Sequence, residues 1–257
     1  MTEEEFLKTY DMGAYPRPSV TVDQVILAFD GDEDVSVLLV RRGGHPYKGR
    51  WGLPGGFVHT GPTLADQESA DEAAARELAE ETSLTSTWCE QFHAYTEPGR
   101  DPRGHVMSIA YVGAVPTARI GDVELAAGDD ARDAKWFRLR RKGDDLALTS
   151  DDGETLKGSD LAFDHARIIS DAVAHLATKL RVTDVATHFV GDGETFSMPQ
   201  VRKFCESILS IASGEDVRLD PGNFHRDFRR IVEAAENGRS GPRGAALWRR
   251  KGATRTK

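Results

Sequence analysis

Three glutamates, Glu77, Glu80 and Glu81, have the types and the spacing to do chemistry. In a helix they are related as i, i+3 and i+4, so their carboxylates emerge on one face with Cβ atoms about 5–6 Å apart. Like charges at this distance repel, and the repulsion must be offset by water, by basic neighbours or by a hard divalent cation. Arg76 can reach Glu80 at i+4 and orient it. Two interpretations stay open: a metal-binding catalytic site and a solvated acidic helix face.

A glycine pair precedes this segment. Gly55 and Gly56 lack a Cβ, so their backbone can approach a phosphate or a metal closely. A long polar loop then leads into the helix-like stretch SADEAAARELAEETS (69–83), whose alanines and Leu78 form a narrow apolar flank. This flank allows the helix to lie close against a sheet while the carboxylates face away from it.

The whole arrangement resembles the Nudix box, G-x5-E-x7-R-E-U-x-E-E-x-G-U, where U is aliphatic. After Glu68 and seven further residues come the matching residues, which are Arg76, Glu77, Leu78, Glu80, Glu81 and Leu84. Two departures are present. Eleven residues separate Gly56 from Glu68 where the motif has five, and Ser83 stands at the place of the final glycine. Neither departure removes a carboxylate, but the insertion of six residues could reshape the mouth of the substrate site.

The resemblance implies hydrolysis of a nucleoside diphosphate linked to another moiety, with Mg²⁺ or Mn²⁺ as the cofactor. Glu77, Glu80 and Glu81 would be the metal ligands, one of them also acting as the base. Arg76 would orient them, and the carbonyl of Gly56 would complete the coordination. The chemistry is reasonable, because divalent ions neutralise a diphosphate, activate a water and stabilise the leaving phosphate.

Candidates for ligand contacts also lie outside the box. Arg42, Arg50, Arg100 and Arg103 are candidate phosphate contacts, because a guanidinium can bind phosphate oxygens in pairs. Each of them is equally consistent with an ordinary surface arginine. Trp51 is a candidate for stacking on a base, and its alternative is a place in the core.

The elements that must position these residues are mostly strands. Apolar, β-branched runs predict strands at 19–29, 35–42, 87–95, 105–115 and 133–139. The helix at 69–83 and a second, amphipathic helix at 161–180 complete an α/β (α+β) domain, for which the Nudix resemblance implies an α/β/α sandwich with a mixed sheet. Segment 140–160 is interpreted as a surface loop. We place a domain boundary after the second helix, giving domains 1–180 and 181–257.

The C-terminal segment carries sharp helix signals. Ser197 and Gln200 form a capping box, and an i, i+3, i+4, i+7 apolar stripe follows it. A second helix is predicted from Asp220 to the ENG stretch (236–238), with a core stripe opposed to a basic one. Two helices joined by a link resemble a helix-turn-helix, and the glycine-rich stretch 238–252 suits the wing of a winged helix.

This small domain predicts binding of a double-stranded DNA operator. Base readout is expected from Gln200, Asn223 and His225, and phosphate contacts from the arginines. These arginines are Arg226, Arg229, Arg230, Arg239 and Arg243. The alternative is a dimerisation appendage whose arginines are merely hydrated.

Charge is distributed unevenly along the chain. The net charge of −9 combines 19 basic and 32 acidic residues in 1–180 with 14 basic and 10 acidic residues in 181–257. An acidic body with a basic end favours a polyanionic partner. No apolar run approaches the roughly 20 residues that span a bilayer, and the acidic start of the chain is unlike a signal peptide. A soluble, cytoplasmic protein is therefore expected.

Taken as a whole, the chain resembles the Nudix-related transcriptional regulators of NAD metabolism (NrtR type). The matching stretches are HPYKGRWGLPGGF, GRDPRG, LAFDH, FSMPQ and NFHRDFRR. The resemblance implies a homodimeric repressor whose Nudix domain senses ADP-ribose and then releases operator DNA. Many members have a damaged Nudix box, whereas this chain keeps every carboxylate. A repressor with possible hydrolase activity and an ADP-ribose pyrophosphatase with an assembly domain are therefore both retained as hypotheses.

Overall fold

One mixed sheet forms the centre of the molecule. The computed structural model describes residues 1–61, 63–82, 84, 88–122, 131–143, 145–180, 182–192, 194–239 and 246–251. Within these ranges the strand order is β5-β6-β1-β2-β7-β8-β9, with β3 paired to β2 and β4 to β1. The strands are β1 (Ser19–Phe29), β2 (Val35–Arg42), β3 (Trp51–Gly52), β4 (Gly55–Phe57), β5 (Trp88–Tyr95), β6 (Val106–Val115), β7 (Ala131–Lys142), β8 (Asp145–Ser150) and β9 (Thr155–Lys157). Only β1 and β6 pair in parallel among them.

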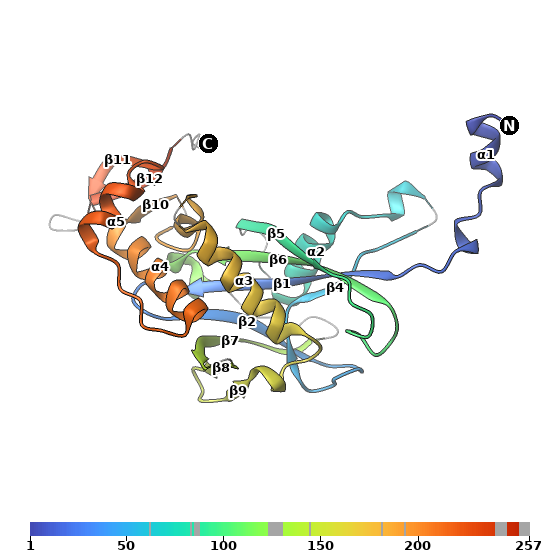
Figure 1. Ribbon diagram of the computed structural model, residues 1–257, viewed down its shortest axis with the longest axis horizontal. Helices are drawn as coiled ribbons and strands as arrows, with labels where there is room; N and C mark the ends of the chain where they lie inside the picture. The colour runs from blue at the N-terminus through green and yellow to red at the C-terminus, as the bar shows by residue number, and fades with distance from the viewer. Residues whose placement is uncertain are drawn as a thin grey trace.

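Helices cover both faces of this sheet (Figure 1). Because side chains alternate along a strand, β1 contributes to two cores at once. Leu27 belongs to the large cluster shared with α3 (His165–Lys179), and Ile26 to a smaller cluster shared with Leu78 of α2 (Ala70–Thr82). This layering confirms the predicted α/β/α sandwich with a mixed sheet.

The C-terminal part builds a second, smaller sheet. Its strand order is β10-β12-β11, and its elements are β10 (Thr195–Ser197), α4 (Met198–Ser213), α5 (Pro221–Phe228), β11 (Val232–Arg239) and β12 (Ala246–Arg250). The predicted capping box is confirmed in part. The Ser197 hydroxyl accepts a hydrogen bond from the Gln200 N–H at 3.4 Å, but the Gln200 side-chain oxygen accepts from the Ser197 hydroxyl and not from its backbone N–H. The helix ends at Gly214, whose φ of 76° suits a residue without a Cβ.

The two parts share one hydrophobic core. Phe204 of α4 stacks on Phe189 with a centroid distance of 4.4 Å and meets Phe29 of β1 edge-on at 5.6 Å. The same buried cluster runs without interruption from β1 and β7 to α4 and β11. The boundary predicted at residue 180 therefore lies within a continuous core, immediately after α3.

Two of the predicted elements need correction. Segment 140–160 is not a loop, because β7 continues to Lys142 and β8 and β9 follow it; Leu146 and Leu148 alternate into the core as a strand pattern requires. The second C-terminal helix ends at Phe228 instead of at 236–238. The following residues pair with β12, in the register Val232↔Arg250, because cross-strand pairing outweighs the helical spacing of their apolar side chains.

The N-terminal segment was not anticipated as a helix. The short helix α1 (Glu3–Thr9) stands at the end of an arm that extends away from the body (Figure 1). Its cap is local, with Thr2 and Glu5 exchanging hydrogen bonds, and none of its residues is buried. No helix within the described ranges is long and apolar enough to cross a membrane.

Replacing Phe204 with alanine should lower the free energy of unfolding by about 3–5 kcal/mol, because deletion of a buried ring leaves a cavity in the shared core. Denaturant unfolding followed by circular dichroism measures this. Phe6→Ala, which removes an exposed ring from the arm, is the control and should change stability by less than about 0.5 kcal/mol. Equal stability of the two variants would contradict a core shared by both parts.

Candidate functional site

The acidic face of α2 looks onto the end of the sheet. Ala73, Ala74 and Leu78 are buried against the strands, which turns the glutamates of the same helix toward an open pocket. The neighbouring wall is the short strand β4, held by β1 in the register Val22↔Gly56. The apolar flank read from the sequence therefore places the carboxylates beside the glycine pair.

Arg76 organises the carboxylates. Its guanidinium donates to Glu68 at 2.6 and 3.1 Å, to Glu77 at 2.8 Å, to Glu80 at 3.1 Å and to the carbonyl of Phe57 at 3.1 Å. The predicted i+4 contact with Glu80 is thus present. The hydrogen bonds from Arg76 lower the pKa of Glu68 to about 2, so this carboxylate is ionised at neutral pH.

Neighbouring atoms lie so close to Gly55 and Gly56 that neither position has room for a Cβ atom. A Cβ on Gly55 would lie 2.1 Å from the carbonyl oxygen of Val22, and its φ of 152° is unfavourable for other residues. A Cβ on Gly56 would lie 2.0 Å from Oε1 of Glu77. The missing side chains therefore allow the carboxylate of Glu77 to reach the main chain of β4.

Glu81 has the most perturbed environment of the three box glutamates. Burial raises its pKa to about 8, and the nearby charge of Glu77 acts in the same direction. One oxygen accepts a hydrogen bond from the N–H of Gly55 at 2.9 Å, which opposes the rise. Within the described residues Glu81 forms no ion pair, so a bound cation would be needed to stabilise its ionised form.

The atoms available as metal ligands in the pocket are of the type that a hard divalent cation prefers. Glu77, Glu80, Glu81 and the Gly56 carbonyl offer only oxygen atoms, which Mg²⁺ and Mn²⁺ prefer. As they stand, no three acidic, histidine or cysteine side chains of the described ranges converge closely enough to hold an ion. In this structure Arg76 forms ion pairs with Glu77 and Glu80 and so neutralises part of the charge that an ion would meet.

These groups open into a pocket of about 540 Å³. The structure brings together Gly56, the box residues and three of the predicted phosphate contacts, which are Arg42, Arg100 and Arg103. Arg50 and Trp51 do not line the pocket. Arg50 donates to the carbonyl of Ser159 at 3.1 Å, and Trp51 is only 3% exposed, with its indole N–H bound to Glu154 at 2.8 Å. The face of Trp51 is therefore not available for stacking on a base, because it forms part of the core.

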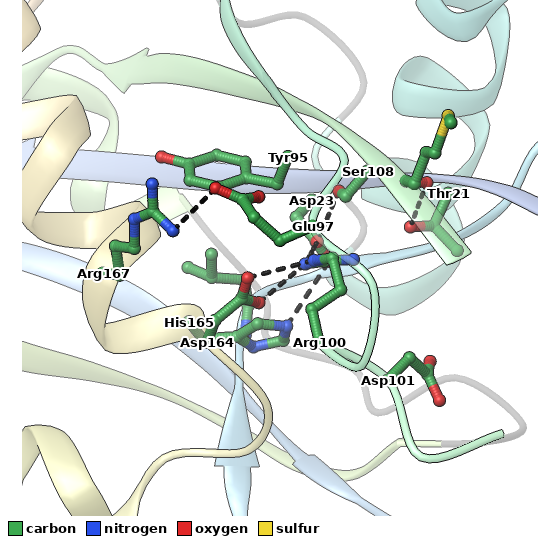
Figure 2. A network of polar contacts seen from close by, with 12 residues as sticks. Thr21, Asp23, Tyr95, Glu97, Arg100, Asp101, Ser108, Asp164, His165 and Arg167 are labelled. Atoms are coloured by element: carbon green, nitrogen blue, oxygen red, sulfur yellow. Dashed lines mark hydrogen bonds and ion pairs between the residues drawn. The ribbon is translucent and has the colours of Figure 1, made fainter. Parts of the chain in front are cut away.

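The guanidinium group of Arg100 is buried and pairs with carboxylates of the protein. Its side chain is 6% exposed, and it donates to both carboxylate oxygens of Asp164 at 2.7 and 3.0 Å and to Asp23 at 3.3 Å (Figure 2). Asp164 stands at the N-cap position of α3, but its side chain makes no capping hydrogen bond and binds Arg100 instead. A direct phosphate contact by Arg100 would have to compete with this ion pair.

Asp23 and His165 form a buried polar floor of the pocket that the sequence analysis does not predict, and Asp164 lies beside them, paired with Arg100 (Figure 2). Asp23 accepts a hydrogen bond from Ser108 at 2.5 Å and faces Nε2 of His165 at 3.5 Å. The signal was present, because Asp23 interrupts the apolar run SVTVDQVILAF of β1. A charged residue inside a buried strand needs a partner or a function.

His165 is held in one tautomer. The N–H of Leu53 donates to its Nδ1 at 2.8 Å, so the neutral ring carries its proton on Nε2, toward Asp23. Burial lowers the pKa of His165, which keeps the ring neutral. Because His165 is also the first residue of α3, the pocket floor is continuous with the helix that packs against α4.

The residues predicted to contact DNA lie mainly on and after α5. Asn223, Arg226, Arg229 and Arg230 are exposed, whereas His225 is half-buried with its ring edge-on to Trp248 at 5.3 Å. The arginines and His225 border a shallow hollow of about 340 Å³.

The remaining three DNA candidates have other surroundings. Gln200 is half-buried at the start of α4, where its side-chain oxygen accepts a hydrogen bond from Ser197 at 2.9 Å. Arg239 is the last residue of β11, and Arg243 lies outside the described residues.

Comparison with known proteins gives matches in both parts of the chain. The family model of the NUDIX domain matches residues 19–157. An ADP-ribose pyrophosphatase of Methanocaldococcus jannaschii is 39% identical over 64% of this chain and 78% of its own length. The ADPR responsive transcriptional repressor NtrR of Acinetobacter baylyi is 29% identical over 81% of this chain and 73% of its own length.

The comparison with solved structures also finds proteins that contain a Nudix domain. A MutT/nudix family protein from Enterococcus faecalis has a TM-score of 0.77 at 29% identity and covers 98% of this chain and 94% of its own. Shewanella oneidensis NrtR complexed with a 27mer DNA has a TM-score of 0.64 at 26% identity, covering 90% and 93% of the two chains. Its NUDIX domain complexed with ADP ribose has a TM-score of 0.52 at 30% identity, covering 68% and 99%.

The family model covers more than half of the chain, and the carboxylate helix, the glycine pair and the mixed sheet all lie inside the matched residues. The chain belongs to the Nudix family.

Proposed function

We propose that this chain is a transcriptional repressor that binds ADP-ribose in its Nudix pocket and operator DNA through its C-terminal part. One observation carries the proposal: the similarity to Shewanella NrtR extends over 90% of the chain, well beyond the residues matched by the Nudix model. That protein has been solved with DNA, and its NUDIX domain with ADP ribose. Because the similarity includes the C-terminal part of both proteins, a common function in DNA binding is favoured.

The pocket has the chemistry for a nucleoside diphosphate. Arg42 and Arg103 supply positive charge to the pocket, and the carboxylates of α2, which also line it, supply negative charge. A diphosphate bridged to these carboxylates by a divalent cation satisfies both sets of charges at once. Nudix hydrolases generally depend on divalent metals, and here Mg²⁺ or Mn²⁺ would be held by Glu77, Glu80, Glu81 and the Gly56 carbonyl. When bound, the ion neutralises the diphosphate and lowers the pKa of a coordinated water.

The basic surface after α4 is proposed to meet DNA. The order α4, α5, β11 and β12 with the sheet β10-β12-β11 is the order of a winged helix, in which α5 would enter the major groove. Exposed Arg226, Arg229 and Arg230 on α5 and its end would then contact phosphates. Because operators of such proteins have two half-sites, we propose a homodimer.

The fold offers a route by which the ligand can alter DNA binding. His165, the first residue of α3, lines the pocket, and the body of the same helix packs against α4. A ligand that interacts differently with two arrangements of α3 and α4 would shift their equilibrium by the difference in binding free energy.

A second candidate is a Mg²⁺-dependent ADP-ribose pyrophosphatase whose C-terminal part serves assembly. It is favoured by the complete set of box glutamates and by the 39% identity to the Methanocaldococcus enzyme. The two activities are compatible, since cleavage of the effector would reset a ligand-controlled repressor.

A mobility-shift assay with the DNA upstream of the protein's own gene, with and without ADP-ribose, tests the proposal. We expect a shifted band that ADP-ribose abolishes, and AMP among the recovered nucleotides if the effector is cleaved. No shift at any protein concentration, together with rapid formation of AMP, would favour the pyrophosphatase.

Glu80→Gln combined with Glu81→Gln should reduce Mg²⁺-dependent cleavage of ADP-ribose by at least about 100-fold, because two of the proposed ligands lose their charge. Release of AMP, followed by chromatography, measures the rate. Glu72→Gln, on an exposed turn of the same helix, is the matched control and should retain activity. Full activity of the double variant would refute the assigned metal ligands.

Arg226→Ala combined with Arg229→Ala should weaken DNA binding and reduce the slope of log K against log salt by nearly 2, because two phosphate contacts are lost. Fluorescence anisotropy at several salt concentrations measures the slope. A control pair, Arg17→Ala with Lys142→Ala, removes two exposed charges elsewhere. If both pairs have the same slope as the wild type, the proposed DNA surface is wrong.

The affinity for Mg²⁺ should rise with pH and level off above about pH 8. The pKa of Glu81 is raised to about 8, so the group is mostly protonated at lower pH, and the ion must displace that proton. Calorimetry in buffers of different ionisation enthalpy measures the proton released near pH 7. Glu81→Gln should remove this release. Proton release by Glu81→Gln equal to that of the wild type would exclude Glu81 as its source.

A further inference from the structure

We propose that Phe163 is a positioning residue that holds Arg42 and Arg103 on the pocket wall as a clamp of two guanidinium groups for a diphosphate. This inference rests on the proposed ligand class and extends it by naming the residue that sets the geometry of the clamp. Phe163 belongs to the LAFDH stretch, and its ring lines the pocket together with both arginines.

The backbone of Phe163 has an uncommon conformation. Its φ of 49° lies in the left-handed region, which a bulky residue rarely adopts. Such strain persists only where the surrounding contacts determine the conformation strongly, and it is often found at functional sites. On one side, the N–H of Ala162 donates to the carbonyl of Trp51 at 2.8 Å. On the other side, Asp164 and His165 are held by the ion pair and the hydrogen bond of the pocket floor.

Both guanidinium groups lie within reach of the Phe163 ring. Cζ of Arg42 is 4.8 Å from the centre of the Phe163 ring, and Cζ of Arg103 is 5.8 Å from it. Phe57 approaches Arg103 in addition, at 4.9 Å. All three distances are within the range of cation–π attraction, about 6 Å. The ring therefore attracts both guanidinium groups and offsets part of the repulsion between them.

Both arginines keep donors that the protein does not use. Arg42 donates from Nε to the carbonyl of Pro46 at 2.8 Å, and within the described ranges its two terminal nitrogens have no protein acceptor. Arg103 uses Nε and Nη2 for the carboxylate of Asp101 at 2.7–3.2 Å, while its Nη1 is unpartnered in the same part of the chain. Burial and the charge of Arg103 lower the pKa of Arg42, although the charges of Glu81, Asp101 and Asp23 act in the opposite direction.

A diphosphate is the ligand class that fits these donors. Two guanidinium groups on one wall can each bind an oxygen pair, one on each of two linked phosphates. Asp101 fixes the orientation of Arg103 by its paired contact, whereas Arg42 has no carboxylate partner among the described residues. The plane of Arg42 is consequently set by Phe163 and the single bond to Pro46, so that removal of the ring should affect Arg42 first.

A double-mutant cycle tests the clamp. The wild type, Phe163→Leu, Arg42→Gln and the combined variant are each titrated by calorimetry with ADP-ribose and with inorganic pyrophosphate. Leucine keeps an apolar side chain and the same backbone strain but has no aromatic face. We expect Phe163→Leu to weaken ADP-ribose binding about tenfold, and the combined variant to bind no more than about threefold more weakly than Arg42→Gln alone. Phe163→Tyr, which keeps the ring, should stay within about twofold of the wild type.

The control is Phe92→Leu, which removes a half-buried ring outside the pocket and should leave the affinity unchanged. Thermal unfolding checks that each variant is folded, and Phe163→Met replaces the leucine variant in the cycle if that one is not. If the wild type binds ADP-ribose while Phe163→Leu binds equally well, or while the two substitutions act additively, the clamp is refuted. If the wild type binds no ADP-ribose, the proposed function fails instead. The same coupling measured with pyrophosphate would then still support the clamp.

Discussion

Electrostatic repulsion among the carboxylates of α2 is the constraint on which the site depends. Arg76 reduces the repulsion among the three glutamates of one helical turn by pairing with two of them and with Glu68. Glu81 reduces it further, because its raised pKa of about 8 keeps it mostly protonated and uncharged below that pH. The glycine pair lets this cluster approach the main chain of β4. The carboxylate cluster is therefore charged and compact without a ligand. A divalent ion bound there would replace the proton of Glu81 and part of the charge neutralisation by Arg76.

The arginines that line the same pocket also repel one another, and their charges must likewise be offset. Arg100 pairs with Asp23 and Asp164, and Arg103 pairs with Asp101, whereas Arg42 forms no ion pair among the described residues and contacts the Phe163 ring. Because Asp164 and His165 begin α3, the same residues that organise this part of the pocket also fix one end of the helix that packs on α4. The pocket and the C-terminal part are thus connected through a single rigid element and one continuous core.

Sequence reasoning found the features that depend on local spacing. The face shared by Glu77, Glu80 and Glu81, the Arg76–Glu80 contact, the Ser197 cap and most of the strands follow from periodicity and hydrogen-bonding rules within a few residues. Features that depend on pairing between residues far apart in the sequence could not be predicted in this way. Val232 fits a helical stripe equally well until β12 pairs with it, and Leu146 and Leu148 lie in a polar segment whose strand character needs β7 as a partner. Asp23 and His165 are 142 positions apart, so no local pattern shows that they meet.

The most direct measurement is a calorimetric titration of ADP-ribose into the purified chain, performed with Mg²⁺ and again with a chelator. We expect saturable binding of one ADP-ribose per chain that becomes tighter when Mg²⁺ is present, because the ion would join the phosphates to the glutamates of α2. Absence of heat from ADP-ribose under both conditions, with no binding of Mg²⁺ itself, would contradict this expectation.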